Sequence, residues 1–320
     1  MIVYTQIETL ARDLGVCARM LYALSNAPQR HYHKAVLRKK DGGTRTLLVP
    51  DEPTKIVQRA ILSNLLAYEP VSPAAAAYRP AFGPERGARL HVGAKKVLTL
   101  DVRGFFDHIR YPDVKNCAFP KERYSEALRV LLARLCCPFE SLPQGAPTSP
   151  AISNLVMREF DETMLSYCAA RGIAYSRYCD DMTFSGDFDA GELAKFAADL
   201  LGARGMTLNR KKTRVRTNAQ RQRVTGLVVN ERVRTDRDYR RALRQELYYC
   251  QKYGIEAHVT RKNITGGAEN YARSLLGRVT RALSFEAGDA ALARGRAFLV
   301  NYLTPENSTS ENLTSENAEE

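Results

Sequence analysis

Residues 174–185 read Ala174-Tyr-Ser-Arg-Tyr-Cys-Asp-Asp-Met-Thr-Phe-Ser185. The runs 174–178 and 182–185 have the short, aromatic and apolar composition that favours β-strands. Asp180 and Asp181 lie between these runs, at a tight turn. A pair of aspartates at a turn is usually solvated and has no chemical role, so the rest of the sequence must decide what these carboxylates do.

A third carboxylate occurs in a similar setting upstream. Val97-Leu-Thr-Leu-Asp-Val102 is predicted to be a short apolar strand, and Asp101 interrupts it. Burying an unpaired carboxylate is costly, so an acid within a strand usually neutralises a cation or pairs with a base. Three acids at the ends of two strands can hold two Mg²⁺ ions about 4 Å apart, an arrangement that stabilises the attacking and leaving oxygens in phosphoryl transfer.

The charge of the chain points to a polyanionic partner. Its 320 residues include 48 Lys and Arg against 35 Asp and Glu, a net charge of +13. Five of the acids and none of the bases fall in the last fifteen residues, so residues 1–305 carry about +18. Nucleic acid is the commonest partner of so basic a protein, although such a charge can also serve solubility alone.

Composition also bears on location. With 44% hydrophobic residues the chain can bury a sizeable core. No apolar run reaches the roughly eighteen residues of a membrane span, and the first residues lack the apolar segment of a signal peptide. The seven cysteines are odd in number and lack the paired spacing of a zinc site. We therefore expect a reduced, cytoplasmic protein with no membrane association.

Further elements follow from hydrophobic spacing and turn residues. The run from Ala35 to Val49 is predicted to be a β-hairpin, because two β-favouring segments flank Asp41-Gly42-Gly43. Residues 72–93 are rich in Pro, Gly, Ala and Arg and are predicted to be loop. Apolar spacing predicts helices within 5–25, 55–68, 122–137, 151–170 and 189–203, a further strand within 215–229, and a basic helical region over 236–303.

Four segments, in order, resemble the motifs of reverse transcriptases. Tyr178-Cys-Asp-Asp181 resembles their Tyr-x-Asp-Asp box, and Leu98-Thr-Leu-Asp-Val-Arg-Gly-Phe-Phe-Asp107 resembles the strand with their first metal-binding aspartate. Leu142-Pro-Gln-Gly-Ala-Pro-Thr-Ser-Pro150 is similar to an element of the bacterial enzymes, and Gly205-Met-Thr-Leu-Asn-Arg-Lys-Lys-Thr213 looks like the next polymerase motif. The resemblance covers roughly residues 35–230.

The resemblance implies an α+β fold, the right-hand polymerase with fingers, a ferredoxin-like palm and a helical thumb. It places the fingers at 1–96 together with 116–146, the palm at 97–115 and 147–228, and the basic helical thumb at 229–305. Residues 306–320 are then a disordered acidic tail.

It also implies the roles of individual residues. Asp101, Asp180 and Asp181 correspond to the acids that bind two Mg²⁺ ions, and the backbone carbonyl of Val102 is expected to be a further ligand. Lys212 corresponds to the lysine proposed to protonate the leaving pyrophosphate. Its neighbour Lys211 is a rival for this role, and a plain surface lysine is the remaining alternative.

A second group of residues is expected to bind the incoming nucleotide. Lys39 and Arg45 flank the hairpin turn, where basic residues of the family close over the triphosphate; solvated charges are the alternative. Phe106 falls where the family has a ring under the sugar, which leaves no room for a 2′-hydroxyl, unless it only fills the core. Gln144 is expected to border the nucleotide or the template, unless it belongs to a plain turn.

Two further segments are similar to retron reverse transcriptases in particular. Val224-Thr-Gly-Leu227 resembles the Val-Thr-Gly element that follows their palm. Gly87-Ala-Arg-Leu-His91 takes the position of their Asn-Ala-x-x-His element, with Gly87 in place of the asparagine, and His91 is then either an RNA contact or structural. In the thumb, arginines suited to phosphates alternate with tyrosines that can stack on bases. The residues expected to bind RNA are His91, Val224, Thr225, Gly226, Arg237, Arg240, Arg241 and Arg244.

The resemblance implies an RNA-directed DNA polymerase, a nucleotidyltransferase that copies a structured non-coding RNA from its own locus. Such an enzyme uses dNTPs to extend the 2′-hydroxyl of an internal guanosine, and it yields a branched, RNA-linked single-stranded DNA (msDNA). Retron systems act in anti-phage defence, usually with a separate effector protein. Two alternatives stay open: a group II intron-like or other bacterial reverse transcriptase, and an RNA-binding scaffold of a toxin-neutralising complex whose polymerase site is idle.

Overall fold

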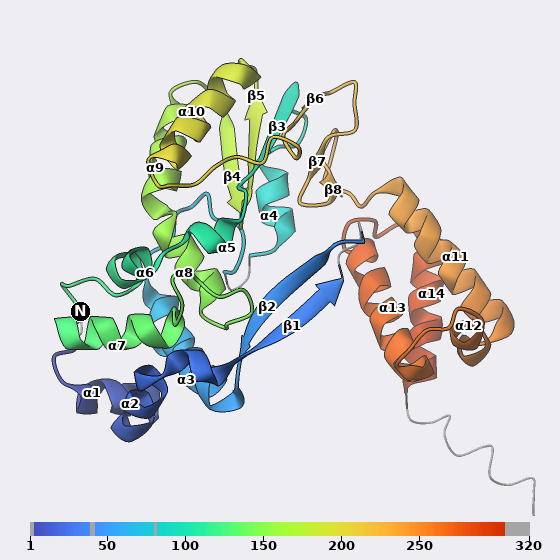
Figure 1. The fold of residues 1–320 in the computed structure, drawn as a ribbon. Coiled ribbons are helices and arrows are strands. Elements are labelled where there is room, and N and C mark those ends of the chain that lie inside the picture. Colours follow the sequence, from blue (N-terminus) through green and yellow to red (C-terminus); the bar gives the residue numbers. More distant parts are fainter. Residues whose placement is uncertain (1–2, 39–41, 80–81, 305–320) are drawn as a thin grey trace, which may run out of the picture. The chain divides into compact units, whose positions relative to one another are not determined.

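The chain folds into two compact units, residues 1–225 and 226–320. The computed structural model describes residues 3–38, 42–79 and 82–304 (Figure 1). Lys39 and the tail expected at 306–320 lie outside the described residues. None of the helices in the described ranges is both long and apolar enough to cross a membrane.

A four-stranded antiparallel sheet forms the centre of the first unit. β3 pairs with β5 in a register that sets Asp101 opposite Asp181. The strands predicted around these two residues are confirmed. In spatial order the sheet consists of β4 (Ala174–Tyr178), β5 (Asp181–Gly186), β3 (Lys96–Asp101) and β6 (Arg214–Thr217).

Helices surround this sheet. The structure differs from the sequence prediction at two places, and the cause in each is local. The spacing over 5–25 gives two helices rather than one, because Gly15 adopts a left-handed φ of 67°. α4 lies in the segment expected to be loop and has Pro84 in its first turn, where proline favours a helix. The helices of this unit are α1 (Ile7–Leu14), α2 (Ala18–Asn26), α3 (Glu52–Asn64), α4 (Pro84–Arg89), α5 (Phe105–His108), α6 (Tyr111–Ala118), α7 (Glu126–Cys136), α8 (Ser149–Val156), α9 (Arg158–Ala169) and α10 (Ala190–Gly202), with short 3-10 turns at Pro28–His31 and Leu66–Tyr68.

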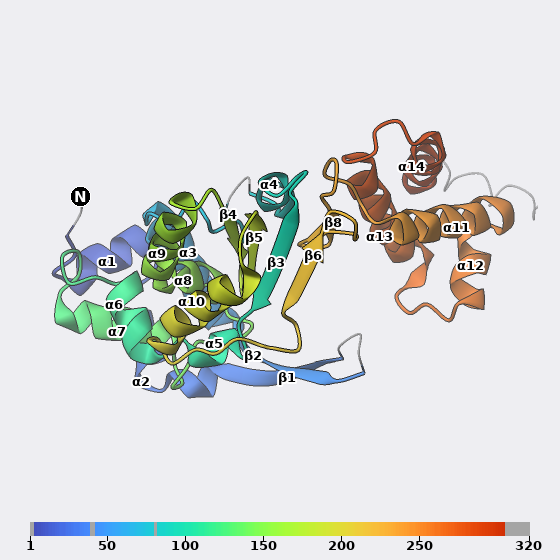
Figure 2. The same ribbon diagram turned by 90° about the horizontal axis from the view of Figure 1, so that it is seen from above.

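The two faces of the sheet carry different partners, because successive side chains of a strand point to opposite sides. Tyr175 and Arg177 of β4 both bond Asp161 of α9. Ser176, between them, bonds His91, which follows α4 on the other side. α9 and α10 run beside each other (Figure 2). The helices and the sheet share one hydrophobic core.

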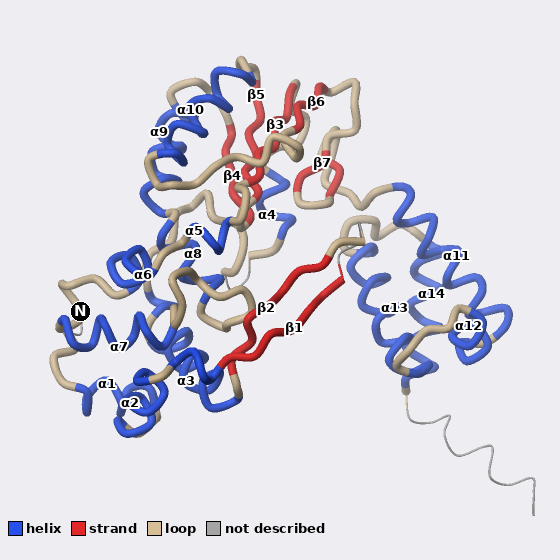
Figure 3. The backbone as a smooth tube through the Cα atoms, in the orientation of Figure 1, coloured by secondary structure: helices blue, strands red, loops and turns tan. Residues whose placement is uncertain are grey.

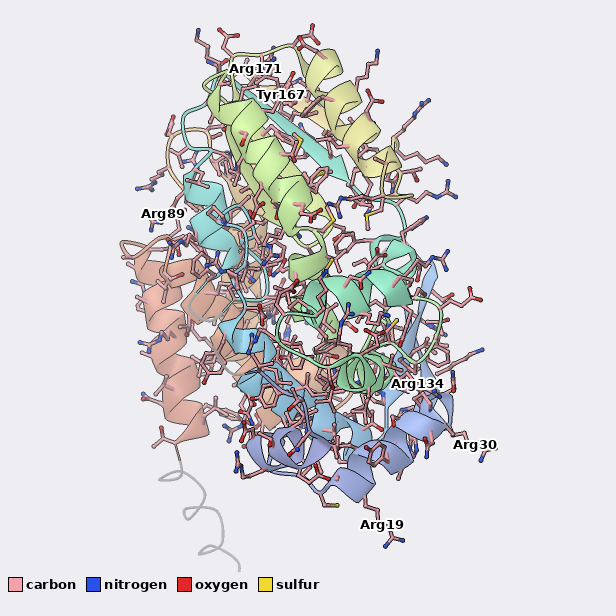
Figure 4. All side chains as sticks on the ribbon, turned by 90° about the vertical axis from the view of Figure 1, so that its left-hand side faces the viewer. Arg19, Arg30, Arg89, Arg134, Tyr167 and Arg171 are labelled. Carbon is pink, nitrogen blue, oxygen red and sulfur yellow. The ribbon has the colours of Figure 1, made fainter. Side chains whose placement is uncertain are left out.

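Stacked side chains join α9 to α10 at one end. The ring of Tyr167 lies 3.9 Å from the ring of Phe196, with 17° between their planes. The guanidinium of Arg171 lies over Tyr167, 3.8 Å from its centroid (Figure 4). These contacts hold the two helices together at their exposed end.

The predicted hairpin is confirmed and forms a sheet of its own. β1 (Tyr32–Arg38) pairs with β2 (Thr44–Pro50), and the register joins Tyr32 to Pro50 and Arg38 to Thr44. The strands are mostly exposed, so the hairpin depends on contacts near its base rather than on a core of its own.

The second unit is a helical bundle with a separate core. Its first regular element is the short strand β8 (Leu227–Val228), which follows β7 (Arg223–Val224), and the other regular elements described there are helices (Figure 3). Gly295 lets α14 approach α11, because a Cβ at this position would overlap the side chain of Leu247. The helical region expected over 236–303 is confirmed as α11 (Arg237–Tyr253), α12 (Ile255–Arg261), α13 (Gly267–Leu283) and α14 (Ala290–Leu303).

Candidate active site

Three carboxylates meet at one end of the central sheet. Asp101 is the last residue of β3 and Asp181 the first residue of β5, and the antiparallel register sets them opposite each other. The carbonyl of Asp180 accepts the N–H of Val102 at 3.1 Å, which ties the two strand ends together. The structure therefore brings together the four residues that the sequence predicts as metal ligands.

The negative charges of the three carboxylates repel one another. Partial burial, and then the negative charges of Asp180 and Asp101, raise the pKa of Asp181 to about 6. Lys212 partly relieves this repulsion, because its Nζ lies 2.6 Å from Oδ2 of Asp101. The hydrogen bond to Asp101 in turn raises the pKa of Lys212. Lys211 is exposed and makes no such contact, so the geometry favours Lys212 over its neighbour.

These residues have the chemistry of a magnesium site. Carboxylate oxygens are the ligands that Mg²⁺ prefers. The pKa of Asp181 is raised first by burial and then by the neighbouring negative charges, and a cation would relieve this repulsion. Within the described ranges no three His, Cys, Asp or Glu side chains are arranged as a preformed metal site. The cation that contacts Asp101 is the ammonium of Lys212.

The turn that carries the aspartates has a strained backbone. Cys179 adopts a φ of 61°, a left-handed conformation that is uncommon for residues other than glycine. Its carbonyl accepts a hydrogen bond from Nη1 of Arg177 at 3.0 Å. Its thiol accepts one from the hydroxyl of Tyr78 at 3.3 Å. Both contacts hold the turn in the conformation that presents Asp180 and Asp181.

Arg177 and Asp161 form a completely buried ion pair behind this turn. The guanidinium donates to both oxygens of Asp161, from Nε at 2.8 Å and from Nη2 at 2.6 Å, and neither side chain is accessible to solvent. Tyr175 adds a third hydrogen bond to the carboxylate at 2.8 Å. Sequence reasoning missed this pair. A charged residue within a short strand was the available signal, the same one that singled out Asp101.

Strand β2 of the hairpin reaches the turn that contains Gln144. Nε of Arg45 donates to Oε1 of Gln144 at 2.6 Å, and the N–H of Leu48 donates to the carbonyl of Gln144 at 2.8 Å. Gly145 permits this approach, because it has a φ of 124° and a Cβ there would lie 2.9 Å from the carbonyl oxygen of Leu48. Two of the predicted nucleotide-binding residues are therefore in contact, and a third, Lys39, lies outside the described residues.

Phe106 lies in the short helix α5, five residues beyond the end of β3. Its ring is 9% exposed and packs edge-on against Phe105, with centroids 5.4 Å apart. Phe105 is the more deeply buried of the two, at 3%. The role of Phe106 in sugar selection stays a prediction.

The structure contradicts a direct RNA contact by His91 and Val224. His91 is completely buried, and its two ring nitrogens lie 2.7 Å from the hydroxyl of Ser185 and 2.8 Å from that of Ser176. Burial lowers the pKa of His91 to about 4, so the ring is neutral. Val224 is 1% exposed and belongs to the core. These two residues have structural roles.

The two retron-like segments are in contact with each other. The hydroxyl of Thr225 donates to the carbonyl of Pro84, the first residue of α4, at 3.1 Å. Gly87, on the same helix, packs so closely that a Cβ would lie 3.1 Å from that of Ala76. A side chain as large as asparagine therefore does not fit at this position without movement of its neighbours. Gly226 is exposed, at the next position of the turn.

The predicted thumb arginines fall into two classes. Arg240 and Arg244 are paired with carboxylates of the same unit, Glu286 and Asp289. Arg237 and Arg241 are exposed and have no recorded partner among the described residues. Arg240 is the less accessible of the two paired arginines, with a side chain that is 16% exposed and held by Glu286. The binding of RNA by these four arginines stays a prediction.

Residues 37–230 match the sequence profile of the family described as reverse transcriptase (RNA-dependent DNA polymerase). The chain belongs to this family. The match includes the three clustered carboxylates, Lys212 and the turn at Gln144. Family membership and the antiparallel sheet together confirm the predicted α+β, right-hand polymerase fold. The division into fingers, palm and thumb stays a prediction.

Curated relatives of this reverse transcriptase are named retron enzymes. The chain is 34% identical over 277 residues to the retron Mx65 reverse transcriptase of Myxococcus xanthus, covering 78% of this chain and 64% of that protein. It is 29% identical to the retron Ec86 reverse transcriptase of Escherichia coli, with 67% and 68% covered. The chain thus spans about two thirds of the length of these relatives.

Among solved structures, the chain is similar to telomerase from Candida albicans in complex with a fragment of telomeric RNA. The TM-score is 0.46 at 9% sequence identity, with 86% of this chain and 64% of that chain covered.

Proposed function

We propose that this chain is a retron-type RNA-directed DNA polymerase. It reverse transcribes a cognate structured non-coding RNA, extends the 2′-hydroxyl of an internal guanosine with dNTPs, and gives a branched, RNA-linked single-stranded DNA. The observation that carries this proposal is the cluster of Asp101, Asp180 and Asp181 at paired strand ends, with Lys212 on Asp101. The names of the relatives support the retron assignment.

The residues divide the chemistry among themselves. Asp101, Asp180, Asp181 and the carbonyl of Val102 would hold two Mg²⁺ ions, which supply positive charge to the attacking and leaving oxygens. Lys212 is positioned by its contact with Asp101 to donate a proton to the leaving pyrophosphate.

The hairpin and the Gln144 turn are proposed to bind the incoming nucleotide. Arg45 neutralises charge on the triphosphate, and Lys39, at the turn of the same hairpin, is proposed to assist it. Gln144, held by Arg45, borders the nucleotide. Phe106 is proposed to exclude the 2′-hydroxyl of a ribonucleotide.

Partners and setting follow from the retron assignment. RNA is bound by Thr225 and Gly226 at the turn and by the exposed arginines Arg237 and Arg241 of α11. The enzyme acts in the cytoplasm, where its RNA is transcribed, and it is proposed to work with a separate effector protein in anti-phage defence. Fingers at 1–96 and 116–146, a palm at 97–115 and 147–228 and a thumb from 229 remain part of this proposal.

The polymerase part is tested by removing one carboxylate charge. Asp180→Asn and Asp181→Asn should each lower Mg²⁺-dependent dNTP incorporation on an annealed DNA primer and RNA template by at least about a hundredfold. Asp187→Asn is the matched control, because this exposed aspartate pairs only with the exposed Lys95 on the surface. Incorporation at the wild-type rate by either of the first two variants would place the active site elsewhere.

The retron part is tested with the RNA that co-purifies with the protein. Sequencing should return one structured RNA from the locus of the gene, and dNTP addition to it should begin at a 2′-hydroxyl. Active polymerisation that starts only from annealed 3′-hydroxyl ends would favour the group II-like alternative. Intact RNA binding with no incorporation on any template would favour the idle scaffold.

A further inference from the structure

A small pocket opens in the second unit where α11 meets α12. Its volume is about 250 Å³, and it is lined by Tyr249, Tyr253, Ala257, His258, Arg261 and Lys262. Gly254, with a φ of 84°, separates the two helices and turns the chain so that they pack against each other. Both walls of the pocket therefore come from one short stretch of chain.

One wall of this pocket is a row of nearly parallel rings. The ring of Tyr249 lies 6.2 Å from that of Tyr253 and 6.1 Å from that of His258, with planes 21° and 18° apart. His258 is buried at the inner end of the row and also packs against Tyr271. Tyr253 is 52% exposed at the outer end. The ammonium of Lys252 lies 5.2 Å from the centroid of the Tyr253 ring, and a planar ligand can continue the row by stacking on Tyr253 in place of this exposed side chain.

The other wall carries positive charge that the protein does not neutralise. Arg261 and Lys262 are exposed, and no carboxylate of the described residues is recorded within ion-pair distance of either one. The nearby Glu256 is engaged by the hydroxyl of Tyr302. This differs from Arg240, Arg244 and Arg278 of the same unit, each of which has a carboxylate partner.

Aromatic rings beside unpaired cations match the chemistry of one nucleotide. A base stacks on an aromatic face whatever its sequence, and Arg or Lys binds the adjoining phosphate. The volume is below the roughly 300–1,000 Å³ of pockets for drug-sized ligands, which agrees with a single base and its sugar. A paired base within a helix could not reach Tyr253, since both of its faces are covered by neighbouring bases.

We propose that the pocket formed by Tyr249, Tyr253, His258, Arg261 and Lys262 binds one unpaired nucleotide of a nucleic-acid strand. The base stacks on Tyr253, and its phosphate lies against Arg261 and Lys262. The inference rests on the proposed function only in that the ligand is a nucleic acid. It assigns to α12 a role in binding that is separate from the arginines of α11.

The test uses hairpin RNAs that contain 2-aminopurine, a base whose fluorescence falls when it stacks. One hairpin has a single bulged 2-aminopurine, and the second has the same base paired. The full-length protein should quench the bulged hairpin and bind it more tightly than the paired one. Tyr253→Leu should abolish this quenching and weaken binding of the bulged hairpin by roughly 5- to 150-fold, the range for loss of one stacked base. Tyr253→Phe should retain the quenching, because its ring can still stack.

The chain offers matched controls for both walls. Tyr248 is on the same helix, is 54% exposed and does not line the pocket, so Tyr248→Leu should leave the quenching unchanged. Arg261→Gln with Lys262→Gln should reduce the salt dependence of binding by about 0.7 of a log unit per lost phosphate contact. Arg294→Gln with Arg296→Gln removes the same charge from exposed positions of α14 and should have a smaller effect.

Two outcomes would overturn the proposal: no quenching of the bulged base by bound wild-type protein, or equal quenching by wild type and Tyr253→Leu. Matching hairpins of DNA show whether the strand is RNA or DNA, and quenching of either supports the pocket. Incorporation of dNTPs on an annealed primer and template is measured on the same preparations. Loss of quenching with incorporation intact concerns the pocket alone, whereas wild-type protein that quenches but does not incorporate contradicts the polymerase function alone.

Discussion

At the residue scale, the carboxylates depend on neighbours that never touch the reacting groups. Arg177 reaches the turn only through the carbonyl of Cys179, and Asp161 acts only through Arg177. A buried ion pair contributes little net stability, but removing one partner leaves a buried charge without compensation. Such a pair is better explained as a means of fixing one geometry than as a source of stability.

Loss of this ion pair should affect stability and activity differently. Asp161→Leu alone should destabilise the fold by about 3–5 kcal/mol, because the charge of Arg177 stays buried and unpaired. Asp161→Leu combined with Arg177→Met should recover most of this loss in urea unfolding. Incorporation by the double variant should remain low, because the carbonyl of Cys179 has lost its donor. A double variant with wild-type kcat and KM would limit the pair to a structural role.

His91 should make stability depend on pH. Burial holds its folded-state pKa at about 4, against an ordinary value of 6.5. The unfolded chain therefore binds a proton below pH 6.5 that the folded chain does not bind until about pH 4. The free energy of unfolding should fall as the pH is lowered through this window, by up to about 3 kcal/mol at 1.36 kcal/mol per pKa unit.

The measurement is urea unfolding between pH 7.5 and pH 5, for wild type and His91→Gln. The variant should be less stable at pH 7.5, because the hydrogen bonds with Ser176 and Ser185 are altered. Its dependence on pH should be flatter. The same slope in both proteins would mean that another group is responsible.

At the scale of elements, the position of the hairpin depends on one glycine. β2 contacts the rest of the unit where the N–H of Leu48 bonds the carbonyl of Gln144, and Gly145 leaves room for this contact. Arg45 reaches Gln144 from the same strand. The position of the side chains proposed to bind the nucleotide is therefore set at the Gln144 turn, not within the hairpin.

Gly145→Ala should displace the hairpin. The strained φ should cost about 1–3 kcal/mol, and the methyl group would press on the carbonyl of Leu48. We expect KM for dNTPs to rise several-fold in primer extension. Gly172→Ala is the matched control, because Gly172 also has a positive φ, of 65°, but has nothing within 4 Å of the added Cβ. Equal effects of both changes on KM would rule out the close approach as the cause.

Much of the secondary structure could be predicted from the sequence. The rest depends on contacts between segments that are distant in the chain. The strands around Asp101 and Asp181 were recognisable because an acid in an apolar run is unusual. α4 was missed because Gly, Ala and Arg give no helical pattern and the helix is defined by its packing on Ser176 and Ala76. His91 was assigned to RNA binding because nothing in the local sequence indicates that a histidine in a basic segment is buried against the face of a sheet.

At the scale of the whole molecule, the net charge of +13 overstates the positive charge that is available to bind a polyanion. Several arginines of the second unit are engaged by its own carboxylates, among them Arg240, Arg244 and Arg278. Binding of RNA should therefore depend on the basic residues that have no carboxylate partner, not on the total number of basic residues.

Two pairs of arginines on α11 test this expectation. Arg237→Gln with Arg241→Gln should weaken binding of the co-purified RNA and lower its salt dependence by about 0.7–0.9 of a log unit per lost phosphate contact. Arg240→Gln with Arg244→Gln should chiefly lower the melting temperature, because Asp289 loses Arg244 and Glu286 keeps only the exposed Arg232 as an ion-pair partner. Filter binding at several salt concentrations and thermal unfolding distinguish the two. The reverse assignment of effects would show that the internal ion pairs open when RNA binds.

The two separate cores have an evolutionary consequence. Leu247 and Leu299 pack in one core, whereas Leu98 and Phe184, on the strands that carry Asp101 and Asp181, pack in another. Amino-acid replacements that re-pack one core leave the side chains of the other in place. A lineage can therefore change the side chains of its helical bundle while those of the other core are inherited unchanged, and recombination near residue 226 would exchange one bundle for another in a single step.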